Sequence, residues 1–233
     1  FALILGVASV RTATATPYSD VILADNPVVY YTFDEAAGST IANNIGSTGA
    51  TYNTQQVNSV NFGVTSFNAN MGTAVDLGTT NGHFSMNPLT GNANHYTTWL
   101  NTDNTSLEFW FRTTQTDQGG GSGWNNPHLL GDDNAGCCGG GGSDSWWGTL
   151  ESSQDAGKGG GATDLVIGAN TGNNPINVTS DTTINDGEWH HVVMTRGASS
   201  PANNISIYVD GVLEEVNPFG NPNNTYQTIG APA

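Results

Sequence analysis

Four oxygen-bearing side chains lie close together in one glycine-rich stretch and could bind a metal ion. They are Asp132, Asp133, Asn134 and Asp144. Calcium takes about six to eight oxygen ligands from Asp, Asn, backbone carbonyls and water, so the cluster is a candidate calcium site. Turns collect the same residue types, because Asp and Asn bond their own backbone. A solvated acidic turn therefore remains an equally good interpretation.

The two cysteines of the chain, Cys137 and Cys138, are adjacent in the same stretch. Neighbouring Cα atoms lie about 3.8 Å apart, which is short of the usual disulfide range of about 4.4–6.8 Å. A vicinal disulfide is strained but feasible among glycines, and it would stiffen the loop. Two free thiols and bridges to another subunit stay open, whereas a zinc site would need more ligands than two cysteines.

Aromatic side chains are concentrated in or beside the expected loops. Such rings can stack on sugar rings, bury at a subunit interface, or pack the loops down as a local cluster. The last interpretation fits the adjacent Trp146 and Trp147 best. The candidates for sugar or interface contacts are Tyr96, Trp99, Trp124, Trp146 and Trp147.

The pair His190-His191 invites a metal or catalytic interpretation. It lies in a β-branched run, Val192-Val193-Met194-Thr195, which prefers an extended strand. Successive side chains of a strand point to opposite faces, so the two imidazoles cannot chelate one ion together. A structural role is therefore expected for both.

The elements that must position these residues follow a turn and strand pattern. Asn185-Asp186-Gly187 is turn chemistry, and Asp210-Gly211 suits a type I′ hairpin turn between Ile205–Val209 and Val212–Val216. The segment therefore reads as consecutive antiparallel strands. The strand Ser106–Arg112 should place Leu107, Phe109 and Phe111 on one face and Glu108, Trp110 and Arg112 on the other.

This pattern resembles the laminin G-like domains of the concanavalin A-like lectin/glucanase superfamily. The stretch Asn185–Arg196, followed by Ile205–Gly211, resembles the family's Trp-His-His strand and its Tyr-Val-Asp-Gly turn. Further segments that resemble family elements, in the expected order, are Pro27–Glu35, Ser106–Arg112, Trp124–Gly131 and Asp144–Leu150.

The resemblance implies an all-β fold, an antiparallel jelly-roll β-sandwich of concanavalin A-like type. It also implies that the histidine pair belongs to the scaffold and that a rim calcium is common. We expect Trp189 to be a core anchor rather than a sugar platform. Asp34 and Glu35 are a weaker second calcium candidate, because several superfamily members hold calcium near the first strand. The fold alone does not determine function.

Catalysis is not expected. The superfamily's glycoside hydrolases use two carboxylates on one strand face. Glu108 stands in a suitable strand, but no second acid lies two or four residues away. Glu214 and Glu215 are adjacent, so they should face apart.

The charge and composition of the chain limit the classes of partner that it can bind. The chain has 233 residues, with 4 Lys and Arg against 20 Asp and Glu, for a net charge of -16. Binding to nucleic acid or to an anionic membrane requires cationic side chains, so neither partner is expected. No stretch approaches the ~18–20 apolar residues of a membrane span. The low content of charged residues resembles that of extracellular bacterial surface proteins, and a secreted context favours oxidised cysteines.

We expect an apolar arm and linker over residues 1–16 and one jelly-roll domain over 17–233. The stretch Thr12–Asp20 should be extended, and Val21–Leu23 a short turn or helix. Strands are expected at Val28–Phe33, Thr73–Leu77, His83–Met86, Leu165–Gly168, Asn177–Thr179 and Thr182–Ile184.

The arm has two interpretations. Ala13-Thr14-Ala15 could be the cleavage site of a clipped signal peptide, or the arm could persist and be buried through Phe1, Leu3, Leu5 and Val7. The family's usual last strand is not evident before Ala233, which would leave an open edge. Strand donation between subunits could fill such an edge, and a fragment that lacks its last strand is the alternative.

The sequence thus predicts an extracellular, non-enzymatic surface protein that assembles with copies of itself by N-terminal strand donation. The alternative is a calcium-dependent carbohydrate-binding or adhesion module.

Overall fold

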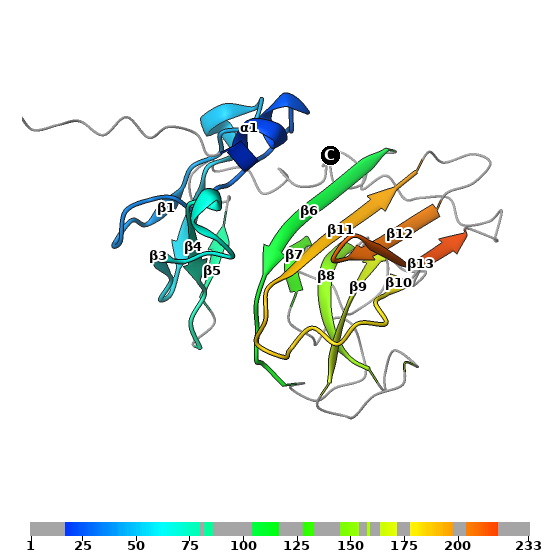
Figure 1. Ribbon diagram of the computed structural model, residues 1–233. Coiled ribbons are helices and arrows are strands. Elements are labelled where there is room, and N and C mark those ends of the chain that lie inside the picture. The colour runs from blue at the N-terminus through cyan, green and yellow to red at the C-terminus, as the bar shows by residue number, and fades with distance from the viewer. Residues whose placement is uncertain are drawn as a thin grey trace, which may run out of the picture. The chain divides into compact units, whose positions relative to one another are not determined.

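The computed structural model describes nine parts of the chain (Figure 1): residues 17–79, 82–85, 104–116, 128–132, 145–153, 158, 164–171, 178–197 and 204–218. It divides into two compact units, Phe1–His95 and Tyr96–Ala233, and each is described by itself. The single jelly-roll domain expected over residues 17–233 stays a prediction.

In its described residues, the first unit contains one short α-helix, two 3₁₀ turns and five short strands. The strands form two antiparallel sheets, with the orders β1-β2-β5 and β3-β4. The elements are α1 (Pro17–Ala24), β1 (Ile41–Ala42), the 3₁₀ turn η1 (Gly49–Tyr52), β2 (Thr54–Val57), β3 (Asn61–Thr65), the 3₁₀ turn η2 (Ala69–Met71), β4 (Thr73–Asp76) and β5 (His83–Ser85).

Helix α1 corrects the expectation of an extended linker up to Asp20. Pro17 occupies the start of the helix, where the missing N–H is harmless, and Asp20 stands in the first turn, where a carboxylate favours the positive end of the helix. The helix ends where Asn26 adopts a positive φ of 53°, a frequent conformation after a last turn. The helix expected at Val21–Leu23 is confirmed and is longer than predicted.

The strand expected at Val28–Phe33 is wrong. The backbone groups of this stretch bond to the loop that follows β1: Asn44 Oδ1 accepts the Tyr30 N–H at 2.8 Å, and Thr48 N–H donates to the Val28 carbonyl at 3.3 Å. Phe33 has a φ of 57°, which an extended strand cannot accommodate. The β-branched and aromatic composition is used for packing rather than for a ladder.

Aromatic rings form the core of the first unit. Phe62 is buried together with Ala42 and Val60. The Phe33 and Phe84 rings stack with centroids 5.5 Å apart, and Phe62 is tilted against Phe84 at 5.6 Å. Rings at these separations attract each other beyond their burial, so three segments far apart in sequence meet in one cluster.

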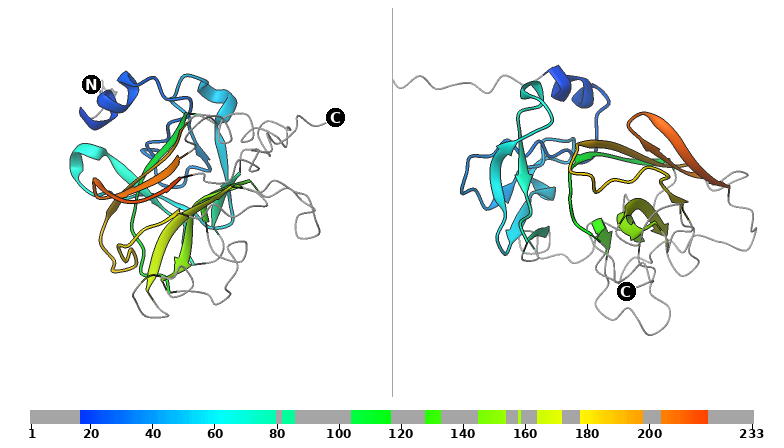
Figure 2. Two further views of the ribbon diagram at one scale, coloured as in Figure 1. Left: turned by 90° about the vertical axis from the view of Figure 1, so that its right-hand side faces the viewer. Right: turned by 60° about the horizontal axis from the view of Figure 1, so that its bottom comes forward.

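The part of the second unit that the structure describes is a sandwich of two four-stranded antiparallel sheets, with the orders β13-β12-β11-β6 and β10-β9-β8-β7. Figure 2 shows the two sheets as separate layers. The strands are β6 (Thr105–Phe111), β7 (His128–Asp132), β8 (Ser145–Ser152), β9 (Leu165–Thr171), β10 (Val178–Thr179), β11 (His190–Arg196), β12 (Asn204–Val209) and β13 (Val212–Pro218). The predicted all-β class is confirmed.

The core of this sandwich draws apolar side chains from both sheets. The first sheet contributes residues from β6, β11 and β12, and the second from β8, β9 and β10, which confirms that the two sheets bury their facing sides against each other. The cluster comprises Phe111, Leu150, Ile167, Val178, Ile184, Val192, Met194, Ile205, Ile207 and Val209.

Strand β11 lies between β12 and β6 in its sheet. Its side chains alternate between the core face and the outer face, and this alternation positions the site. Its residues from His190 to Arg196 are buried at every second position. Leu107, Phe109 and Phe111 of β6 pack on the core, as predicted. The hairpin turn between β12 and β13 is also confirmed, because Asp210 and Gly211 both have positive φ, 52° and 81°, as a type I′ turn requires.

The strand expected at Thr182–Ile184 is wrong. Glu214 Oε2 accepts the backbone N–H groups of Asp181 at 2.7 Å and of Thr182 at 3.0 Å. A side chain thus satisfies donors that would otherwise need a neighbouring strand. Ile184 remains fully buried in the core, so the segment packs inward without forming a ladder.

Candidate functional site

Most of the predicted site residues lie outside the residues that the structure describes. This holds for the arm residues Phe1, Leu3, Leu5 and Val7, for Cys137 and Cys138, for Tyr96, Trp99 and Trp124, and for Asp133, Asn134 and Asp144. The vicinal disulfide and the calcium cluster therefore stay predictions.

Three of the predicted residues lie in the paired strands β7 and β8. Asp132 pairs with Ser145, Trp146 with Gly131, and Trp147 with Leu130. The structure thus places the backbone of Asp132 next to the strand that carries both tryptophans. Within the described part of the chain, no group of three or more His, Cys, Asp or Glu residues could hold a metal ion.

Asp34 and Glu35, the weaker calcium candidate, serve two different loops. Asp34 Oδ1 accepts the Thr73 N–H at 2.6 Å, and Glu35 Oε1 accepts the Asn43 N–H at 2.7 Å. Each carboxylate thus fixes a backbone segment of a different loop, and a calcium ion at this pair stays a prediction.

The strongest constellation within the described residues lies on the face of β6 and β11 that is turned away from the core. Trp110 of β6 is paired directly with His191 of β11, and their rings stack with centroids 4.7 Å apart at an interplanar angle of 27°. His191 Nε2 also lies 3.0 Å from Glu108 Oε1. An indole, an imidazole and a carboxylate therefore meet on one sheet surface.

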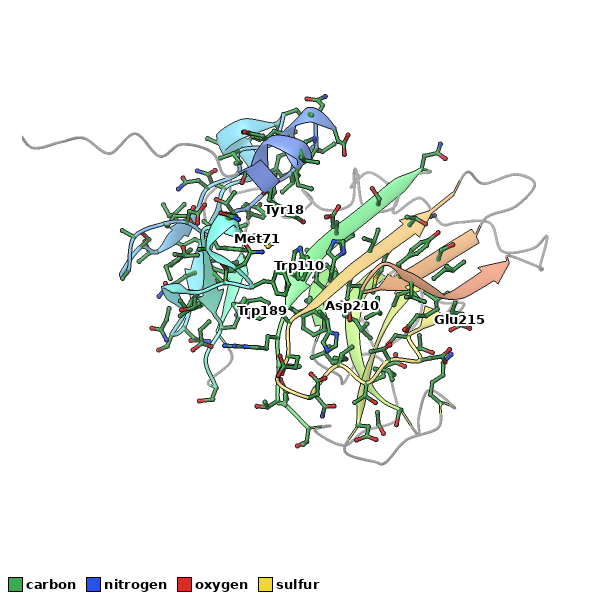
Figure 3. The ribbon with its side chains drawn as sticks, viewed as in Figure 1. Tyr18, Met71, Trp110, Trp189, Asp210 and Glu215 are labelled. Atoms are coloured by element: carbon green, nitrogen blue, oxygen red, sulfur yellow. The ribbon has the colours of Figure 1, made fainter. Side chains whose placement is uncertain are left out.

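The same face continues one step toward the start of β11. The Arg112 guanidinium lies 5.3 Å from the centroid of the Trp189 ring, a cation–π distance. Because residues two apart in a strand share a face, Arg112 follows Trp110, and Trp189 precedes His191. We call these five residues, Glu108, Trp110, Arg112, Trp189 and His191, the aromatic strip; Figure 3 labels both tryptophans.

The aromatic strip is partly open to solvent. The side chains of Glu108 and His191 are 38% and 24% exposed, Arg112 is exposed, and the two tryptophans are half-buried. The sheet fixes the orientation of these half-buried rings. This combination of fixed rings and reachable polar groups is typical of small binding sites.

Trp189 corrects the expectation of a core anchor. It is half-buried and stacks with Arg112, whereas Val192 and Met194 are fully buried in the core. The strand period explains the difference, because position 189 shares the face of 191 rather than that of 192 and 194. Parity along the strand was available in the sequence and would have placed Trp189 correctly.

The two histidines point to opposite faces, as predicted. His190 is on the core side, with its side chain 8% exposed, and both ring nitrogens face carboxylates: Nδ1 lies 2.9 Å from Asp210 Oδ2, and Nε2 lies 3.2 Å from Asp186 Oδ1. Burial alone would lower the pKa of His190, but the hydrogen bonds to Asp210 and Asp186 outweigh it and raise this pKa above its usual value of 6.5.

Both aspartates belong to turns. Asp210 Oδ1 accepts the His191 N–H at 2.9 Å, and Asp186 Oδ1 accepts the Glu188 N–H at 2.8 Å. The bond from Glu188 is the main cause that lowers the pKa of Asp186 below 3.8, with a further contribution from His190. A protonated His190 thus links the 185–187 turn, the β12–β13 turn and the start of β11.

Glu214 and Glu215 do not face apart, which corrects the expectation from their adjacency. Glu215 Oε2 accepts the Thr179 N–H at 2.8 Å, and Glu214 binds the next residues of the same segment. A bulge in the pairing of β12 with β13, between Ile207 and Tyr208, inserts an extra residue in β13. Bulges turn consecutive side chains toward one side.

Lys158 forms ion pairs with Asp181 and Glu215. Its Nζ lies 2.9 Å from Asp181 Oδ1 and 3.5 Å from Glu215 Oε2. The hydrogen bond to Asp181 is the main cause that raises the pKa of Lys158 above 10.5. The arrangement is an ion-pair network between a loop and a strand, and it resembles no catalytic pair.

A family model described as the concanavalin A-like lectin/glucanases superfamily matches residues 77–231, about two thirds of the chain. The chain belongs to this superfamily. The predicted laminin G-like domain is confirmed, and the match spans the whole sandwich of the second unit, including the aromatic strip. No curated protein and no solved structure matches the chain.

Among the helices that the structure describes, none has the length and apolar character to cross a membrane. The superfamily includes both carbohydrate-binding proteins and glycosidases. Membership therefore does not decide between binding and hydrolysis, and the residues of the site must be compared with what each activity requires.

Proposed function

We propose that this protein is an extracellular, non-enzymatic carbohydrate-binding or adhesion module that holds a glycan on the aromatic strip. The observation that carries the proposal is the stack of the Trp110 and His191 rings, with the Glu108 carboxylate hydrogen-bonded to His191. These groups lie on the face of the sheet that is turned away from the core, and the superfamily contains lectins.

The physical basis is the match between these groups and a sugar. The apolar face of a pyranose packs on an aromatic ring, and its hydroxyl groups donate to a carboxylate and accept from a guanidinium. Trp110 pairs with His191 across the two strands, and Trp189 lies two residues before His191, so the two tryptophans are diagonal neighbours, which are about 7–8 Å apart. Together they could support more than one sugar ring.

Binding is favoured over hydrolysis by the surroundings of the carboxylates. Glycosidases need a second carboxyl group across the scissile bond from the first. The described acids nearest His190, Asp186 and Asp210, are engaged by that histidine on the other side of the sheet. Glu108 is bonded to His191, which suits an orienting group for a ligand hydroxyl.

Calcium remains part of the proposal through Asp132, Asp133, Asn134 and Asp144. A calcium ion there would order the glycine-rich stretch around these residues, because carboxylate and amide oxygens are its preferred ligands. Binding that disappears on chelation and returns with added calcium would support this role. Binding that is unaffected by chelation would remove calcium from the proposal.

The deciding experiment is a glycan array followed by calorimetry on wild type, Trp110→Ala and Glu108→Gln. Burial of apolar surface contributes about 25 cal/mol per Å², so loss of the indole contact should cost about 1–2 kcal/mol. Trp110→Ala should therefore weaken binding at least about fivefold, and Glu108→Gln should weaken it less. Phe67→Ala is a matched control, since Phe67 is a 48% exposed aromatic residue of the first unit. Equal affinity of all four proteins would overturn the proposal.

A second candidate function is self-assembly into a filament or layer. The observation that favours it is that β6 and β13 occupy the two ends of their sheet in the described part of the chain, and an edge strand is a template for another chain. The arm residues Phe1, Leu3, Leu5 and Val7 alternate as a donated strand would require. A head-to-tail contact of this kind propagates as a filament if it does not close.

Negative-stain electron microscopy of the full chain beside a version without Phe1–Val10 tests this candidate. Filaments that vanish with the arm would support it. Discrete particles in both samples would exclude it and would leave glycan binding as the function.

A further inference from the structure

His190 is not part of the aromatic strip and has no role in the glycan binding proposed above. Its ring is buried, yet both nitrogens face carboxylates at 2.9 Å and 3.2 Å. An imidazole can donate from both nitrogens only when it is protonated. The geometry therefore describes an imidazolium held between two anions.

We propose that His190 is a pH-sensitive latch that holds the Trp189 end of the aromatic strip in place. Asp186 lies in the turn that leads into Trp189, and Asp210 accepts the backbone N–H of His191. The latch therefore holds the chain before Trp189, at Asp186, and at His191, whose backbone N–H bonds to Asp210. The consequence for ligand binding rests on the function proposed above, whereas the latch itself does not.

The surroundings of the ring determine what happens when the proton leaves. Within the described residues, the charged groups that face His190 are Asp186 and Asp210, and β6 presents the uncharged Phe111 ring, 6.3 Å away. A neutral imidazole keeps one N–H, so one carboxylate would then face a lone pair. That contact becomes repulsive and must open.

The two bonds are unequal, which identifies the one that opens. The contact to Asp210 is shorter, and the same carboxylate also accepts the His191 N–H. The contact to Asp186 is longer, at 3.2 Å against 2.9 Å, whereas both carboxylates are about half exposed and each also accepts one backbone N–H. Deprotonation should therefore release the 185–187 turn, and with it Trp189 and its contact with Arg112.

The direction of the pH dependence follows from the raised pKa of His190. The latch is complete at pH values below the ordinary histidine range and is lost as the pH rises through the raised value. We expect the glycan to bind several-fold to about tenfold more weakly once the latch is open, since one charge-assisted hydrogen bond is worth about a factor of ten.

Nuclear magnetic resonance of the full chain from about pH 5 to about pH 9 tests the latch without any ligand. The imidazole nitrogens of His190 and the indole N–H of Trp189, assigned with Trp189→Phe, are followed together. We expect both to titrate with one midpoint above 6.5, and Asp186→Asn to shift this midpoint downward. His83→Asn, a change at another strand histidine, should leave the midpoint unchanged.

A His190 midpoint below 6.5, or a Trp189 signal that does not follow it, would overturn the latch. Glycan affinity measured over the same pH range separates the two proposals. Binding that falls with the His190 midpoint, and earlier in Asp186→Asn, supports coupling. Flat binding with a moving Trp189 overturns the coupling and keeps the binding function. No binding at any pH rejects the proposed function while the resonance titration still decides the latch.

Discussion

The face of the strand on which a residue of the sandwich lies determines the partners of its side chain. Trp189, the residue before β11, and His191 lie on the outer face, while His190 and Val192 lie on the core face. The two pairs have different partners. His190 meets two aspartates and His191 meets an indole and a glutamate. Two identical neighbours in the sequence therefore have unlike chemical roles.

Gly148 shows how tightly one position can be constrained. It has a φ of 73°, and an added Cβ would lie 3.1 Å from the Leu129 Cβ and 3.2 Å from the Phe109 Cζ. Gly148→Ala should lower the free energy of unfolding by about 2–4 kcal/mol, because backbone strain of about 1–2 kcal/mol adds to the cost of overpacking. Chemical denaturation measures this change.

Gly211→Ala is the matched control for that substitution. Gly211 has a similar φ of 81° but nothing within 4 Å of an added Cβ. It should show only the strain, about 1 kcal/mol. Equal losses in the two variants would mean that the contacts around Gly148 do not matter.

At the scale of elements, the bulge in β13 directs two carboxylates toward one segment. Glu214 accepts from the backbone of Asp181 and Thr182 and from the Thr182 hydroxyl. The segment before β11 is therefore held by a side chain of the edge strand rather than by a ladder.

Glu214→Ala should destabilise the protein by about 1–3 kcal/mol, because the donors of the 181–182 segment lose their shared acceptor. Glu214→Gln should cost less, since one acceptor oxygen remains. Glu188→Ala removes the same charge from an exposed position and should stay within about 0.5 kcal/mol of wild type. Thermal unfolding of the three variants compares them, and a Glu188 loss as large as that of Glu214 would contradict the assignment.

At the scale of the whole molecule, the net charge of -16 opposes compaction. Like charges repel over about a Debye length of roughly 10 Å at 0.1 M salt. The Lys158–Asp181 pair offsets little of this, because Asp181 is 67% exposed and exposed pairs contribute little. The melting temperature should therefore rise by several degrees between ~0.01 M and ~0.5 M potassium chloride, as calorimetry can measure. A fall with salt would mean that ion pairs dominate over repulsion.

The stability of the whole chain should also have a plateau in pH. The raised pKa of His190 gives a contribution that is complete below 6.5 and is lost as the pH rises through the folded-state value. The lowered pKa of Asp186 gives one that is present above 3.8 and is lost as the pH falls through its folded-state value. His190→Asn should flatten the alkaline side of the plateau in melting curves, and an unchanged alkaline slope would argue against the latch.

Much of the sandwich could be predicted from local patterns. The faces of Ser106–Arg112, the β11 strand and the Asp210–Gly211 turn follow from the period of two and from turn chemistry, which depend on neighbours in sequence. The strand expected at Val28–Phe33 was wrong because its hydrogen bonds go to the 44–48 loop. The sequence analysis did not predict the aromatic strip as a binding site, although it correctly placed Glu108, Trp110 and Arg112 on one face of their strand.

The sequence by itself determined the fold class, the superfamily and the alternation that places Trp110 and Arg112 on one face of their strand and separates His190 from His191. The same alternation puts Trp189 with His191, although Trp189 was expected in the core. Only the tertiary structure decided that Trp110 stacks on His191, that His190 lies between Asp186 and Asp210, and that Glu214 and Glu215 serve one segment. The physical reason is that alternation is a property of a single strand, whereas partners across a sheet depend on register and on bulges. These are determined by pairing between segments that lie far apart in the chain.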